Sequence, residues 1–183
     1  MSYVLGKTVV LVGMMGAGKT AIGTALAKRV GAPFLDSDQE IERAANMTIA
    51  EIFARDGEPF FRIKEAQIIS RLLETRRCIL STGGGAYLAE ETRTRITSAG
   101  VAVWLNADLE LLWQRVRHKD TRPLLRTADP KGTLTGIFEK RAPYYAKADI
   151  IVDAKASYAI EDMVEQVVQA LLRRPDVLKE RSA

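Results

Sequence analysis

The sequence predicts an α/β protein in which helices cover both faces of a parallel sheet. Five short apolar runs alternate with amphipathic stretches, and these runs are rich in β-branched residues and bounded by Gly or Asp. A glycine-rich turn also joins the first long run to a helical pattern. Short strands that are separated by helices are typical of parallel sheets, so we expect three layers with the sheet in the middle.

The expected elements follow one another in a regular order along the chain. The strand candidates are Thr8–Val12, Pro33–Leu35, Cys78–Ser81, Val101–Leu105 and Asp149–Val152. The helix candidates are Thr20–Val30, Asp38–Ala45, Thr48–Arg55, Pro59–Thr75, Glu90–Ala99, Leu109–Arg117, Leu134–Tyr145 and Tyr158–Arg173. Thr48 and Glu51 have the spacing of a capping box, which marks a helix start. We expect one domain over residues 1–173 and a flexible tail over 174–183, because the tail is polar and contains Pro175.

Composition excludes several classes of protein. A chain of 183 residues, 47% hydrophobic and 27% charged, can bury a core, so a largely disordered protein is excluded. Cys78 is the only cysteine and there is one histidine, which excludes an internal disulfide and a Cys/His zinc cluster. The apolar run near the start is short and interrupted by glycine, unlike a secretory signal or a membrane span. We therefore expect a cytoplasmic protein without a membrane partner.

The net charge of +4 is concentrated in one segment. Residues 114–126 carry five Arg or Lys side chains against one Asp, and the rest of the chain is balanced. A broad nucleic-acid-binding face is therefore not expected. A compact basic segment suits a small polyanionic ligand, although a solvated helix end would have the same composition.

The loop from Gly13 to Thr20 matches the G-x-x-x-x-G-K-[ST] pattern of a P-loop, between a predicted strand and a predicted helix. Gly13, Gly16 and Gly18 allow backbone angles that let successive N–H groups surround a phosphate. The helix start adds its positive dipole end. Lys19 can reach the β- and γ-phosphates, and the Thr20 hydroxyl can bind Mg²⁺. The pattern predicts nucleoside triphosphate binding and disfavours a plain glycine turn with a surface lysine.

Two acidic residues follow the second predicted strand. Asp36 and Asp38 are two residues apart, so in extended chain their carboxylates project to the same side. One can hold Mg²⁺ through water while the other lies near an acceptor hydroxyl. Alternatively, Ser37 or Asp38 simply caps the next helix.

Two further motifs can bind a second, anionic substrate. Arg62 and Glu65 share a helix face, and an arginine held by a carboxylate is a preorganised fork for a carboxylate or phosphate. Gly83–Gly85 follow the third predicted strand and would let a ligand approach the backbone closely. The alternatives are an exposed ion pair of little energetic value and a flexible turn.

Two more arginines lie near predicted loops. Arg122 belongs to the basic segment, and Arg141 opens a run that leads to the last strand. Basic residues on a mobile loop suit a lid that closes on phosphates and supplies a cation to the transition state.

Taken together, these motifs resemble the shikimate kinase family of nucleoside-monophosphate-kinase-like P-loop enzymes. The resemblance extends from Gly13 to Asp149 and rests on GMMGAGKT, LDSD, GEPFFR, STGGG, RPLL and the R-x-P-x-Y…AD run. It implies a five-stranded parallel sheet with a substrate-binding section near residues 37–65 and a lid near 116–130. It also implies transfer of the ATP γ-phosphate to the 3-hydroxyl of shikimate with Mg²⁺. We expect a monomer whose partners are ATP and shikimate.

The resemblance assigns roles on the nucleotide side. Gly13, Gly16, Ala17 and Gly18, followed by Lys19 and Thr20, would bind the phosphates. Lys19 and Arg122 would contact the transferring phosphate, and Arg115 would lie near the adenine. Thr20, with Asp36 acting through water, would hold Mg²⁺.

The resemblance also assigns the substrate side. Asp38 would bind the ring hydroxyls and accept the proton of the attacking hydroxyl. Arg62 and Arg141 would clamp the substrate carboxylate, with backbone contacts from Gly84 and Gly85. Lys19, Asp38 and Arg122 would then be the catalytic residues.

Two other functions remain open from the sequence. A relative that acts on another small polyol acid, such as gluconate, would share the P-loop and lid, although Arg62, Gly83–Gly85 and Arg141 together disfavour it. A nucleotide-binding regulatory module without catalysis would predict loss of Lys19, Asp38 or Arg122, and all three are present. For shikimate, we expect Phe60 or Phe61 to pack against the ring.

Overall fold

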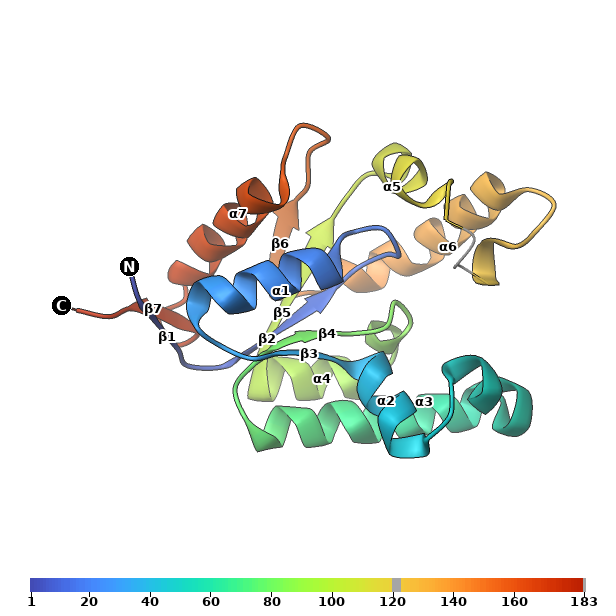
Figure 1. Cartoon of the computed structure of the whole chain (residues 1–183), viewed down its shortest axis with the longest axis horizontal. Helices are drawn as coiled ribbons and strands as arrows, with labels where there is room; N and C mark the ends of the chain where they lie inside the picture. The colour runs from blue at the N-terminus through green and yellow to red at the C-terminus, as the bar shows by residue number, and fades with distance from the viewer. Residues whose placement is uncertain (120–122, 183) are drawn as a thin grey trace.

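Five parallel strands form the centre of the protein. The computed structural model describes residues 1–119 and 123–182 (Figure 1). The strand order is β3-β4-β2-β5-β6, and all four neighbouring pairs are parallel. The strands are β2 (Thr8–Val12), β3 (Phe34–Asp36), β4 (Ile79–Ser81), β5 (Gly100–Asn106) and β6 (Ile150–Asp153). The predicted fold class is confirmed.

Helices cover both faces of this sheet. α1 (Lys19–Val30) and α7 (Ile160–Leu172) lie together on one face, and α4 (Glu90–Ala99) lies with part of α3 (Ile49–Thr75) on the other (Figure 1). Because both faces are covered, β2 is buried along its whole length and β5 along all but its last residue. Strands buried on both faces consist of continuous apolar residues, so they could be predicted from the sequence.

The other helical segments gather beyond the carboxyl ends of the strands (Figure 1). They are α2 (Ser37–Ala45), η1 (Ala86–Leu88), α5 (Leu109–Val116), η2 (Pro123–Leu125) and α6 (Pro130–Tyr145). In a parallel α/β sheet this is the edge at which ligands bind.

A kink divides α3 close to where the sequence predicted two separate helices. Gly57 has φ 83° and ψ 168°, which is not helical and favours glycine. Pro59 follows, at the start of the next helical turn, where its missing N–H costs nothing. Thr48 caps the first half, with its Oγ1 accepting from Glu51 N at 3.1 Å. The kink places Arg62 in the first turns of the second half.

The two ends of the chain form a second, two-stranded sheet. β1 (Tyr3–Leu5) pairs antiparallel with β7 (Leu178–Glu180), and Val177 and Leu178 are buried. Residues 177–180, which belong to the tail expected to be flexible over 174–183, are therefore packed against the start of the chain. Strand β7 was not predicted from the sequence because three residues are too few to show a periodic pattern. The strand is stabilised by pairing with the opposite end of the chain.

Across the described ranges, 1–119 and 123–182, no helix is both long and apolar enough to cross a membrane.

Candidate active site

A cavity of about 1180 Å³ opens at the carboxyl ends of the strands. It brings together most of the residues that the sequence singled out, from segments far apart in the chain. The predicted residues lining it are Gly16, Gly18, Lys19, Thr20, Asp36, Asp38, Arg62, Gly84, Gly85, Arg115 and Arg141. Gly13 and Ala17 belong to the same P-loop but do not line the cavity, and Arg122 lies outside the described residues.

The P-loop leads from β2 directly into α1. Gly16 and Gly18 have φ values of 83° and 90°, so both positions favour glycine. At Gly16 a Cβ atom would also lie 2.7 Å from Val116 Cγ1. Lys19 Nζ donates to the carbonyl oxygens of Gly13 at 2.7 Å and Met14 at 3.0 Å, so the ammonium group lies over the loop. This arrangement brings a glycine-rich backbone, a helix N-terminus and a cation together, which suits a phosphate chain.

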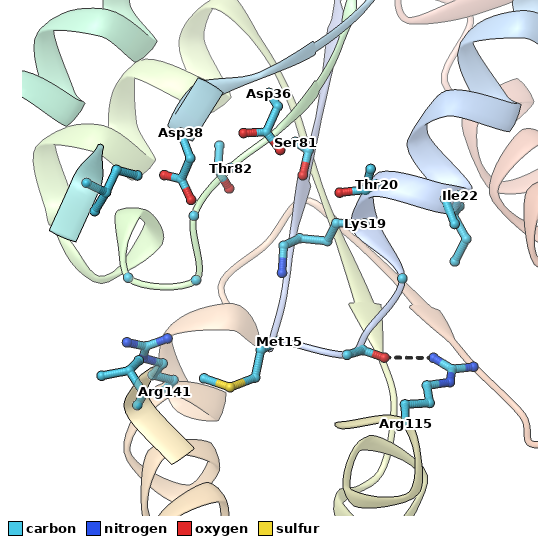
Figure 2. A pocket seen from close by; sticks show the side chains of 18 of the residues that line it. Met15, Lys19, Thr20, Ile22, Asp36, Asp38, Ser81, Thr82, Arg115 and Arg141 are labelled. Carbon is cyan, nitrogen blue, oxygen red and sulfur yellow. Dashed lines mark hydrogen bonds between the residues drawn. The ribbon is translucent and has the colours of Figure 1, made fainter. Parts of the chain in front are cut away.

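Asp36 and Asp38 lie on opposite sides of a strand-to-helix junction. Asp36 ends β3 and caps α2, with Oδ1 accepting from Gln39 N at 3.1 Å. The alternative that Ser37 or Asp38 is the cap is wrong. Asp38 lies in the first turn of α2, so the extended geometry assumed from the sequence does not hold. Both carboxylates still face the cavity. Asp36 lies near Ser81, and Asp38 lies near the loop of residues 83–85 after β4, called the glycine loop below (Figure 2).

Asp38 is a carboxylate with unusually high proton affinity. Burial raises its pKa to about 6, and the negative charges of Asp36 and Glu42 add to the rise. Lys19 and Arg62 act in the opposite direction. A pKa near neutrality lets a carboxylate accept a proton in one step and release it in the next.

Arg62 and Glu65 form a partly buried ion pair. Arg62 Nη1 donates to Glu65 Oε1 at 2.8 Å, and a weaker contact joins Arg62 Nη2 to Glu58 at 3.3 Å. The Glu65 side chain is only 4% exposed, so the alternative of an exposed pair of little value is wrong. Burial raises the pKa of Glu65, and Arg62 opposes that rise. Glu65 Oε2 is buried without a hydrogen-bond partner among the described atoms.

Each glycine of the loop after β4 faces one of the predicted binding side chains. A Cβ atom at Gly83 would lie 2.8 Å from Asp38 Oδ1, and one at Gly84 would lie 2.6 Å from Arg141 Nη1. One at Gly85 would overlap the Arg62 guanidinium. The loop therefore lacks side chains because three charged groups occupy that space, which disfavours a plain flexible turn.

Arg115 contacts the P-loop at the end of the cavity away from Asp38 and Arg141 (Figure 2). Its Nη1 donates to Gly16 O at 3.0 Å from α5 (Figure 2). The two halves of the cavity thus differ: Arg115, Lys19 and Thr20 lie on the P-loop side, and Asp38 and Arg141 lie on the side of the glycine loop (Figure 2).

Comparison with known proteins decides which family shares this arrangement. The family model described as shikimate kinase matches residues 15–172. The chain belongs to the shikimate kinase family. Among its members, the shikimate kinase of Ruegeria pomeroyi is 63% identical over 175 residues, which is 96% of this chain and 90% of that protein. The shikimate kinase of Cereibacter sphaeroides is 62% identical over 175 residues, 96% of this chain and 87% of that protein.

A solved structure of this family has the same fold. Shikimate kinase from Acinetobacter baumannii, solved in complex with shikimate, superimposes with a TM-score of 0.84 at 36% identity. The match covers 91% of this chain and 93% of that one. The resemblance drawn from the sequence motifs is confirmed.

Sequence reasoning missed several cavity residues of this shikimate kinase family member. The segment after β6 and the start of α7 supply one wall, through Ala154, Tyr158, Ala159, Ile160 and Met163. Their position after the carboxyl end of a parallel strand was the available signal, but they carry no motif.

One of the two phenylalanines named from the sequence belongs to the aromatic lining of the cavity. Phe61 and Phe53 line the cavity, with ring centroids 4.7 Å apart, whereas Phe60 does not and is 37% exposed. Of the two phenylalanines proposed from the sequence, only Phe61 lines the cavity.

Proposed function

We propose how this chain carries out the reaction of the shikimate kinase family, the transfer of the ATP γ-phosphate to the 3-hydroxyl of shikimate. The P-loop side of the cavity binds ATP, and the side formed by Asp38, Arg62, Arg141 and the glycine loop binds shikimate. The observation that carries this proposal is that one cavity holds a phosphate-binding loop beside two arginines and a carboxylate of raised pKa.

The nucleotide half acts through backbone dipoles and cations. Backbone N–H groups of the P-loop bind the phosphates, and Arg115 contacts the adenine side. Lys19 and Arg122 neutralise the charge that develops on the transferring group. Phosphoryl transfer depends mainly on this positioning and neutralisation.

The donor set on this side fits Mg²⁺. Thr20 contributes a hydroxyl and Asp36 a carboxylate, both hard oxygen donors, and both face the cavity. The described residues hold no group of three or more His, Cys, Asp or Glu that would form a complete metal site. This is the pattern expected where the phosphates supply other ligands. Thr20 would bind the ion directly and Asp36 through water, and the bound ion would neutralise phosphate charge.

The acceptor half positions one hydroxyl of shikimate. Arg62 and Arg141 bind the carboxylate, and Asp38 accepts a hydrogen bond from the 3-hydroxyl. As the hydroxyl oxygen bonds to the γ-phosphorus, its proton passes to Asp38 and the bond from phosphorus to the β–γ bridging oxygen breaks. The products are shikimate 3-phosphate and ADP.

An ADP-release assay with a panel of hydroxy acids tests this function. With ATP and Mg²⁺, shikimate should give the fastest release, gluconate should give little above background, and EDTA should abolish the activity. Equal rates with gluconate, or release that does not depend on an added acid, would contradict the proposal.

The same proposal includes a monomer in the cytoplasm, where ATP is available, without nucleic-acid or membrane partners. Its support is that one chain supplies the described residues of both halves of the cavity. Light scattering coupled to gel filtration should give a mass near 20.2 kDa. A stable dimer whose dissociation lowers activity would contradict it.

A further inference from the structure

Tyr145 joins α6 to the glycine loop. Its hydroxyl donates to Gly84 O at 2.5 Å, between residues 61 positions apart in the chain. The side chain is fully buried and does not line the cavity. A buried tyrosine needs a hydrogen-bond partner for its hydroxyl, and here the partner is the backbone of the glycine loop.

The same hydroxyl lies beside Arg141, one helical turn earlier on α6. A Cβ atom at Gly84 would lie 2.6 Å from Arg141 Nη1 and 3.4 Å from the Tyr145 hydroxyl, so all three groups meet at one point. A hydrogen bond and the charge of Arg141 both lower the pKa of Tyr145, against the larger effect of burial. Tyr145 thus contacts two elements that the proposed function assigns to shikimate.

The Tyr145 ring packs against Trp104, which lies beside the start of the P-loop. Its ring centroid is 5.9 Å from that of Trp104 on β5, and Trp104 Cδ1 is 3.4 Å from the Cβ position of Gly13. The ring is therefore fixed by the core at the start of the P-loop, while its hydroxyl reaches the glycine loop.

We propose that Tyr145 is a positioning residue that fixes the Gly84 peptide and the Arg141 guanidinium in the geometry that binds shikimate. This inference rests on the proposed function of Arg141 and Gly84. Tyr145 contacts neither substrate, so its effect should be confined to the acceptor half of the cavity.

The test is the kinetics of Tyr145→Phe, which removes one oxygen and keeps the ring. We expect the KM for shikimate to rise about 3- to 10-fold, as for loss of one hydrogen bond. The KM for ATP should change less than twofold. Tyr87→Phe is the matched control, because Tyr87 is also buried and its hydroxyl donates to a carbonyl outside the loop, Lys147 O at 3.4 Å. Tyr87→Phe should leave both KM values unchanged.

Three outcomes would overturn the positioning role. They are an unchanged KM for shikimate, an equal rise in both KM values, and the same selective rise in Tyr87→Phe. Partial unfolding of Tyr145→Phe does not obscure the result, because it lowers the active concentration and hence the apparent kcat but not KM. Failure of the proposed function is distinguishable, since the unsubstituted protein would then show no shikimate-dependent ADP release.

Discussion

The guanidinium of Arg62 is held by a carboxylate that is buried more deeply than the arginine itself. Nη1 lies 2.8 Å from Glu65 Oε1, and the two side chains are 34% and 4% exposed. Glu65 thus anchors the arginine from the protein side, while Nε and Nη2 make longer contacts with Glu58 Oε1 at 3.4 and 3.3 Å and the side chain lines the cavity. Such a fixed fork costs little side-chain entropy when it binds a carboxylate.

Arg62→Ala should weaken shikimate binding selectively. Loss of a charge-assisted hydrogen bond corresponds to about 1.5–3 kcal/mol, so the KM for shikimate should rise roughly 10- to 100-fold. The KM for ATP should stay within about twofold. Arg55→Ala is the matched control, because Arg55 lies on the same helix and pairs with the neighbouring Asp56. Equal losses for both substrates would indicate damage to the fold.

Asp38→Asn should abolish turnover and make the protein more stable at neutral pH. Because its pKa is raised on folding, protonated Asp38 is favoured in the folded protein. The stability that depends on this proton is fully present below about pH 4 and is lost as the pH rises through about 6. The neutral amide introduced by Asp38→Asn does not carry a buried charge. The free energy of unfolding of this variant at pH 7.5 should therefore exceed that of the unsubstituted protein by about 1–3 kcal/mol. Calorimetric ATP binding should be retained. Near-native turnover would remove Asp38 from its proposed role.

The pH dependence of kcat/KM for shikimate should show an acidic limb. Asp38 must be ionised to accept a proton, so the rate should be level above about pH 7 and fall as pH drops through about 6. Histidine is the other side-chain type that changes charge in this range, so His118→Gln is the control and should keep the limb. A limb that disappears in His118→Gln would contradict the assignment to Asp38.

Leu178→Ala should destabilise the protein without changing its kinetics. Leu178 is 1% exposed within the β1–β7 pair, and truncation of a buried leucine costs about 2–5 kcal/mol. The melting temperature should fall by several degrees, whereas Lys179→Ala, on the exposed side of the same strand, should change it little. A melting temperature equal to that of the unsubstituted protein would mean that this end is not packed.

Features with a local cause could be predicted from the sequence. The P-loop pattern, the buried strands and the helix start at Thr48 depend on neighbouring residues, so spacing alone revealed them. The break near Gly57 was predicted for the same reason, because Gly and Pro act on their own backbone.

The amino-acid order by itself determined the α/β class, the P-loop and the membership of one kinase family, because each is encoded in short contiguous patterns. Only the tertiary structure decided that Asp36 rather than its neighbours caps α2, that Glu65 is buried beneath Arg62, and that Leu178 pairs with the opposite end of the chain. It also decided that Tyr145 meets Gly84. These facts depend on which distant segments pack together and exclude water, and periodicity within a single segment carries no record of that.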